Sequence, residues 1–128
     1  MSAEASPTRI LVADDELSTR EMLYRLLNRY GEIIEAASGR QALDILESEH
    51  FDLVLLDVMM PGMTGIEVLE MMRRLPETSG LPVLLLSEFL WGEDAVRGID
   101  IDEADYISKP IDIDMLLARV EAHLHASG

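Results

Sequence analysis

The sequence predicts a single α/β domain built on a parallel sheet. Apolar blocks of strand length alternate with amphipathic blocks of helix length along nearly the whole chain. Three of the strand blocks are almost wholly apolar, as expected of strands that helices cover on both faces. A length of 128 residues suits one domain and leaves no room for a second.

The predicted strands are short and mostly apolar. They lie over residues 10–13, 33–36, 53–56, 83–86 and 105–107. Strict alternation with helices implies parallel strands joined by right-handed crossovers. Open sheets of this kind bind ligands beyond the carboxyl ends of their strands. We therefore expect the functional residues directly after each strand.

Five helices are predicted between and after these strands. Their apolar residues fall at helical spacing over about 22–30, 42–46, 66–72, 93–99 and 113–124. Ser38 with Gln41 and Thr64 with Glu67 have the spacing of a capping box at a helix N-terminus. The helix over 93–99 has the weakest pattern of the five.

The composition indicates a folded protein that binds neither nucleic acid nor membranes. Hydrophobic residues make up 48% and charged residues 27%, close to the globular average. Ten basic residues against 25 acidic ones give a net charge of −15, which repels nucleic-acid phosphates and anionic lipid. Since there is no cysteine, disulfides, thiol nucleophiles and Cys-based zinc sites are excluded.

No apolar run is long enough to span a bilayer. The first residues are polar and lack the basic segment of a signal peptide. We therefore expect a cytoplasmic protein with a flexible N-terminal tail over residues 1–8 and its folded domain over 9–126.

Chemically reactive side chains follow four of the predicted strands. Asp14 and Asp15 follow the first, Asp57 the third, Ser87 and Glu88 the fourth, and Lys109 the fifth. Converging carboxylates repel each other by roughly 4 kcal/mol per pair at 4 Å and an effective dielectric of 20, so a cation is expected among them. Oxygen ligands without His or Cys favour Mg²⁺. Lys109, the only lysine, would add further positive charge.

Asp57 is the best placed of these residues to act as a nucleophile toward phosphorus. It ends a rigid apolar strand, whereas Asp14 and Asp15 belong to the loop opposite. A carboxylate flanked by a metal, a hydroxyl and an ammonium can form an aspartyl phosphate. We predict that Asp57 is the acceptor and that the acid pair holds the metal.

Three segments resemble the receiver domain of two-component response regulators of the chemotaxis-regulator type. They are Leu11–Asp15 (LVADD), Leu55–Gly65 (LLDVMMPGMTG) and Tyr106–Pro110 (YISKP), and the match spans roughly Arg9–Leu124. The ordered set is specific, although each motif alone is weak. The resemblance implies a flavodoxin-like, doubly wound, five-stranded sheet in the order 2-1-3-4-5 with five helices. It also implies a protein that is not an enzyme and catalyses only its own phosphorylation and dephosphorylation.

The resemblance further implies how the phosphoryl site works. Asp57 would take a phosphoryl group from a histidine kinase or phosphotransfer protein. Asp15, Asp57 and the backbone carbonyl of Met59 would ligate Mg²⁺ directly, and Asp14 would act largely through water. An output domain or a second copy of the chain would be further partners.

A switch is implied by the same resemblance. Ser87 and Lys109 would bind the phosphoryl oxygens. The hydroxyl of Ser87 would move toward the phosphate while the ring of Tyr106 turns inward, reshaping the face of the fourth helix, fifth strand and fifth helix. The Lys109–Pro110 bond is expected to be cis.

Two residues depart from the family pattern. Glu88 stands where the family usually has a small residue, and it puts an anion beside the phosphate site. We predict slower or more selective phosphorylation as a result. Asp102 stands where many receivers carry Gly before the fifth strand, so a different turn is expected there.

The same residues bear on other functions. A receiver-like protein-interaction module that works without phosphorylation stays open because of Glu88 and Asp102. A haloacid-dehalogenase-like, Mg²⁺-dependent phosphatase needs a second acid two residues after its nucleophile, where this chain has Met59. Flavodoxin and nucleotide-binding functions need a glycine- or hydroxyl-rich phosphate loop after the first strand, whereas Asp14 and Asp15 would repel phosphate unless a metal intervened.

Overall fold

The sheet has the predicted topology. The computed structural model describes residues 7–99 and 101–126. In this part of the chain, five parallel strands form one sheet in the order β2-β1-β3-β4-β5. The strands are β1 (Arg9–Ala13), β2 (Glu32–Ala36), β3 (Leu53–Asp57), β4 (Val83–Ser87) and β5 (Tyr106–Ser108). The flavodoxin-like fold class is thereby confirmed.

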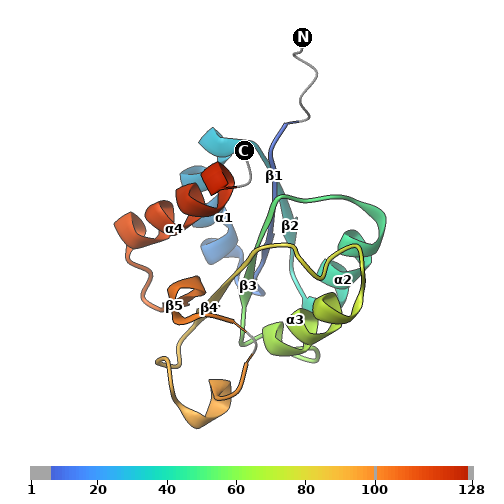
Figure 1. Cartoon of the computed structure of the whole chain (residues 1–128). Coiled ribbons are helices and arrows are strands. Elements are labelled where there is room, and N and C mark those ends of the chain that lie inside the picture. The colour runs from blue at the N-terminus through green and yellow to red at the C-terminus, as the bar shows by residue number, and fades with distance from the viewer. Residues whose placement is uncertain (1–6, 100, 127–128) are drawn as a thin grey trace.

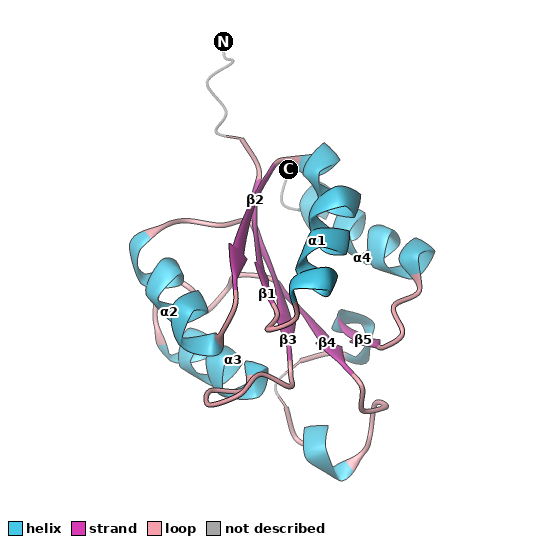
Figure 2. Cartoon of the chain, turned by 180° about the vertical axis from the view of Figure 1, so that it is seen from behind, coloured by secondary structure: helices cyan, strands magenta, loops and turns pink. Residues whose placement is uncertain are grey.

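Helices cover both faces of the sheet. They are α1 (Leu17–Leu27), α2 (Gly39–Ser48), α3 (Gly65–Arg74) and α4 (Ile113–Ala126). Figures 1 and 2 show α1 and α4 together on one face and α2 with α3 on the other. A single 3-10 turn, Asn28–Tyr30, follows α1 directly.

Two hydrophobic clusters, one on each face, hold these layers together. Alternate residues of a strand point to opposite faces. In β3, Val54 and Leu56 pack in the cluster under α2 and α3, whereas Leu53 and Leu55 pack in the cluster under α1 and α4. Every residue of β3 is buried, and Asp57 is its last residue. The predicted phosphoacceptor therefore ends a strand that is packed on both sides.

The predicted helix starts are confirmed. The Ser38 hydroxyl accepts a hydrogen bond from the backbone N of Gln41 at 3.1 Å. Thr64 and Glu67 form a complete capping box, in which each side chain accepts a hydrogen bond from the other residue's backbone N, at 3.2 and 2.9 Å. Both contacts satisfy amide groups that have no partner inside the helix.

The predicted helix over 93–99 is wrong. Among the described residues between β4 and β5 there are only two 3-10 turns, Asp94–Val96 and Glu103–Asp105. Gly92 and Gly98 flank the first turn with φ of 96° and 80°, which a right-handed helix does not contain. The short stretch between them cannot offset the cost of helix nucleation. The described chain thus has four α-helices, and α4 is the fifth helix of the prediction.

The segment between β4 and β5 still covers the sheet. Val96 is buried and packs with Phe89, Ile99 and Ile101 in the cluster on the α2 and α3 face. In Figure 1 this orange segment extends beyond the carboxyl end of the sheet. Near its end, the Asp102 carbonyl accepts a hydrogen bond from the Asp105 backbone N at 2.9 Å.

Two further expectations concern the ends of the chain and membranes. Of the predicted tail over 1–8, residues 1–6 lie outside the described residues. Within the described part of the chain, no helix has the length and apolar character needed to cross a bilayer.

Candidate metal and phosphoryl site

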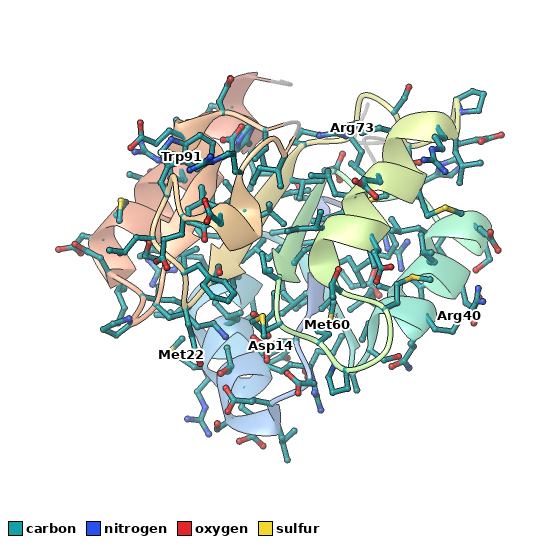
Figure 3. The ribbon with its side chains drawn as sticks, turned by 90° about the horizontal axis from the view of Figure 1, so that it is seen from below. Asp14, Met22, Arg40, Met60, Arg73 and Trp91 are labelled. Carbon is teal, nitrogen blue, oxygen red and sulfur yellow. The ribbon has the colours of Figure 1, made fainter. Side chains whose placement is uncertain are left out.

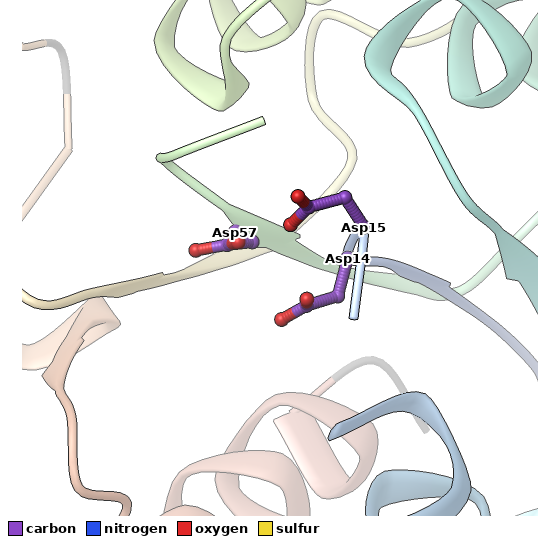
Figure 4. A group of neighbouring side chains, drawn as sticks. All are labelled: Asp14, Asp15 and Asp57. Atoms are coloured by element: carbon purple, nitrogen blue, oxygen red, sulfur yellow. The ribbon is translucent and has the colours of Figure 1, made fainter. Parts of the chain in front are cut away.

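Three carboxylates meet at the carboxyl ends of two neighbouring strands. Because β1 pairs directly with β3, Asp14 and Asp15 lie beside Asp57 (Figure 4). One carboxylate oxygen from each residue lies within 4.8 Å of the other two. Asp14 and Asp57 are buried, whereas Asp15 is exposed. Figure 3, viewed from this end of the sheet, shows Asp14 between Met22 and Met60.

Lys109 joins two of these carboxylates. Its Nζ lies 3.2 Å from Oδ2 of Asp14 and 3.3 Å from Oδ1 of Asp57. The residue follows β5 directly, and its bond to Pro110 is cis, as expected. Three carboxylates against one ammonium leave an excess of negative charge in a mostly buried place.

Burial and the excess of negative charge shift the pKa values of Asp57 and Lys109. Burial, followed by the negative charge of Asp14, raises the pKa of Asp57 from 3.8 to about 6, against the opposite effect of Lys109. Burial lowers the pKa of Lys109, but the charges of Asp14 and Asp57 outweigh it, so that this pKa is raised. Lys109 therefore stays protonated at neutral pH. A hard cation with oxygen ligands, of which Mg²⁺ is the biological example, fits this donor set.

Both the backbone and the carboxylate of Asp14 are hydrogen-bonded. Its backbone N donates to the Ala36 carbonyl at 3.1 Å, and its Oδ1 accepts from the backbone N of Glu16 at 2.8 Å. Its carbonyl accepts from Nη1 of Arg20 at 2.7 Å. By contrast, no described residue hydrogen-bonds or pairs with the carboxylate of Asp15. Sequence reasoning missed Arg20, whose only signal is a cation early in the helix that follows the acid pair.

Ser87 and Tyr106 both hydrogen-bond to the backbone of Phe89. The Ser87 hydroxyl accepts a hydrogen bond from the backbone N of Phe89 at 3.0 Å, and the Tyr106 hydroxyl donates to the Phe89 carbonyl at 2.5 Å. The Trp91 ring stands edge-on to the Tyr106 ring, with centroids 5.3 Å apart and planes at 61°. Burial raises the pKa of Tyr106. The link through Phe89 uses backbone atoms only, so no side-chain pattern signals it.

The remaining predicted site residues border the cluster. The Met59 backbone N lies 3.4 Å from Oδ1 of Asp57, and the Met59 side chain is half exposed. Glu88 is exposed at the start of the segment after β4. A Cβ atom on Gly65 would lie 2.2 Å from the carbonyl oxygen of Asp57, so the start of α3 approaches the end of β3 as only glycine allows. The roles of Met59 and Glu88 stay predictions.

The fold and the site together define a flavodoxin-like α/β protein with an acidic cation site and a lysine at the carboxyl edge of its sheet. The chain belongs to the response regulator receiver domain family, whose sequence profile matches residues 10–121. It is thus a receiver domain of two-component signalling, as the resemblance implied.

Individual relatives agree with this assignment. Over 119 residues the chain is 42% identical to the response regulator MprA of Mycolicibacterium vanbaalenii, covering 92% of this chain and 51% of that protein. The chain therefore spans about half the length of the curated relatives it matches.

Solved receiver structures have the same fold. The receiver domain of Francisella response regulator 1452 superposes with a TM-score of 0.82 at 28% identity, covering 96% of this chain and all 100% of that one. The beryllofluoride-activated receiver of DrrB, a Thermotoga maritima protein, gives 0.77 at 29% identity and covers 94% and 99% of the two chains.

Proposed function

We propose that this domain accepts a phosphoryl group on Asp57, with Mg²⁺, and so switches a surface that regulates a partner or output domain. The proposed donor is a histidine kinase or phosphotransfer protein, and the proposed compartment is the cytoplasm. One observation carries the proposal. The Asp57 carboxylate ends a buried strand with Lys109 at 3.3 Å and the oxygens of Asp14 and Asp15 within 4.8 Å.

Asp14, Asp15, Asp57 and the Met59 carbonyl are the proposed metal ligands, directly or through water. Mg²⁺ bound there would neutralise negative charge on the transferring phosphoryl group and its oxygens. The excess of carboxylates over ammonium groups supports this assignment, because the described residues supply one cation for three anions.

In the transfer step, a carboxylate oxygen of Asp57 forms a bond to phosphorus as the P–N bond of the donor phosphohistidine breaks. The electron pair of that bond stays on the histidine nitrogen. Burial of Asp57 on a rigid strand keeps its attacking oxygen oriented. Lys109 would stabilise the phosphoryl oxygens. Ser87 would donate a hydrogen bond from its hydroxyl to one of them.

The proposed switch rests on Phe89, whose backbone N and carbonyl bond to Ser87 and Tyr106 respectively. When the Ser87 hydroxyl turns toward the phosphoryl group, the Phe89 backbone N loses its acceptor. Tyr106 contacts this segment through the Phe89 carbonyl and the Trp91 ring, so a rearrangement of the segment changes the surface around Tyr106. The phosphoryl group, which carries a charge of roughly −2 in place of the single charge of the Asp57 carboxylate, supplies the bias between the two arrangements.

The experiment follows the fluorescence of Trp91, the only tryptophan. Mg²⁺ is added first and beryllofluoride second, to the wild type and to Asp57→Ala. We expect a change on beryllofluoride addition in the wild type that is absent in Asp57→Ala. The rival function, an interaction module that works without phosphorylation, predicts no response in either protein, and that result would replace the proposal.

A further inference from the structure

Arg20 connects the acid pair to the neighbouring edge strand. From α1 its Nη1 donates to the carbonyl of Asp14 at 2.7 Å, while its Nε donates to Oε1 of Glu35 on β2 at 3.1 Å. The side chain is 14% exposed and that of Glu35 is 36% exposed. The planar guanidinium thus spans two acceptors in a fixed geometry, which a lysine ammonium does not reproduce.

The carbonyl that Arg20 holds belongs to the peptide that joins Asp14 to Asp15. Rotation of that peptide would move the Cα of Asp15 relative to the Asp14 carboxylate. Asp14 is fixed by other contacts as well, but the described residues give the Asp15 carboxylate no hydrogen bond or ion pair. The orientation of the peptide therefore sets the position of the Asp15 Cα, from which the exposed carboxylate extends toward the cluster.

We infer that Arg20 is a positioning residue of the magnesium site, holding the Asp14–Asp15 peptide so that the two carboxylates converge with Asp57. This inference rests on the proposed function, because it assumes that the acidic cluster binds Mg²⁺. Groups that orient metal ligands commonly change metal affinity 10- to 100-fold when they are removed. Arg20 acts through Asp14 and Asp15 and need not touch the metal.

A matched control exists at the opposite end of the same strands. Arg9 on β1 also bridges β2, with Nε at 3.0 Å from Glu32, and it contacts Glu49 and the His50 carbonyl as well. Replacing either arginine by alanine removes one positive charge and one bridge to β2. Of the two arginines, only Arg20 contacts the acid pair, so the two variants separate positioning from general stability.

The experiment measures Mg²⁺ affinity by calorimetric titration of chelator-treated wild type, Arg20→Ala, Arg20→Lys and Arg9→Ala. Urea unfolding in chelator gives the stability of each protein without metal. We expect about tenfold weaker Mg²⁺ binding for Arg20→Ala. Arg20→Lys keeps the charge but loses the geometry that reaches two acceptors, so its Mg²⁺ binding should be weakened to a similar extent. Arg9→Ala should bind Mg²⁺ within about twofold of wild type even where its stability falls.

The sign of the effect makes the test decisive. Loss of a cation makes the chain more negative and by itself strengthens Mg²⁺ binding. Weaker binding therefore indicates lost positioning. Wild-type affinity in both Arg20 variants, or an equal loss in Arg9→Ala, would overturn the inference while leaving the proposed function intact. Absence of Mg²⁺ binding by the wild type would overturn the proposed function and this inference with it.

Discussion

Neighbouring carboxylates have different environments in this site. The sequence predicted Asp14, Asp15 and Asp57 as one cluster because strand ends of a parallel sheet share an edge. It did not distinguish the buried Asp14 from the exposed Asp15. That difference arises because Asp14 continues the ladder of β1 by donating its backbone N to Ala36, so its side chain turns toward Lys109. A tertiary contact of this kind leaves no local pattern.

The raised pKa of Asp57 predicts an unusual pH dependence of stability in chelator. The folded protein keeps the Asp57 proton up to about pH 6, whereas the unfolded chain loses it near 3.8. Between these values the folded state binds more protons, so the free energy of unfolding falls as pH rises. Asp57 alone should contribute a loss on the order of 3 kcal/mol from about pH 4 to about pH 6. Urea unfolding across this range measures it.

Asp57→Asn is the informative variant for this prediction. It removes the titrating group, so its stability should fall less over the same range and exceed that of the wild type at neutral pH. Asp44→Asn, at an exposed position on α2, is the matched control and should follow the wild type. If the free energy of unfolding fell equally with pH in wild type and Asp57→Asn, the effect could not be assigned to Asp57.

The strands and most of the helices were predictable because short sequence patterns mark them. The segment between β4 and β5 was not, because its conformation depends on its glycine turns. The strands are recognised by apolar runs, and α2 and α3 by their capping residues. The segment over 93–99 carries some apolar periodicity, yet its glycines adopt left-handed backbone and prevent a helix. Whether a glycine takes positive φ depends on the surrounding fold, so the pattern alone overestimated helix content there.

The capping box of α3 predicts a measurable contribution to stability. Thr64→Ala removes the acceptor for the Glu67 backbone N, and we expect a loss of about 1 kcal/mol in the free energy of unfolding. Urea denaturation monitored by circular dichroism measures this. Thr64→Ser retains a hydroxyl acceptor and should lose clearly less. Equal stability of Thr64→Ala and wild type would show that water replaces the cap without cost.

At the scale of the molecule, the sheet order brings distant parts of the chain to one edge. The cluster is built from Asp14, Asp57 and Lys109, which follow or end β1, β3 and β5. The residue patterns alone did not predict that Lys109 would contact both carboxylates. That contact needed the family resemblance or the structure. The chain as a whole also carries a net charge of −15. Self-repulsion of this kind destabilises a compact state and is reduced by salt.

The charge predicts that salt stabilises the metal-free protein. Raising NaCl from about 10 mM to about 200 mM shortens the screening length from roughly 30 Å to less than 10 Å, so the melting temperature in chelator should rise. MgCl₂ at equal ionic strength should raise it further, because binding to the folded state adds to screening. Thermal unfolding at matched ionic strengths measures both effects. A melting temperature that stays constant with NaCl would contradict the role given to self-repulsion.

Lys109 has a practical consequence for anyone handling this protein. It is the only lysine, its side chain is 15% exposed, and it sits between Asp14 and Asp57. Among side chains, every acylating dye, lysine crosslinker or acetyltransferase therefore has a single primary amine to modify. Coupling through lysine, as is routine for surface immobilisation, would neutralise that amine and remove the ammonium that pairs with Asp14 and Asp57. An attachment point introduced on an exposed helix position avoids this loss.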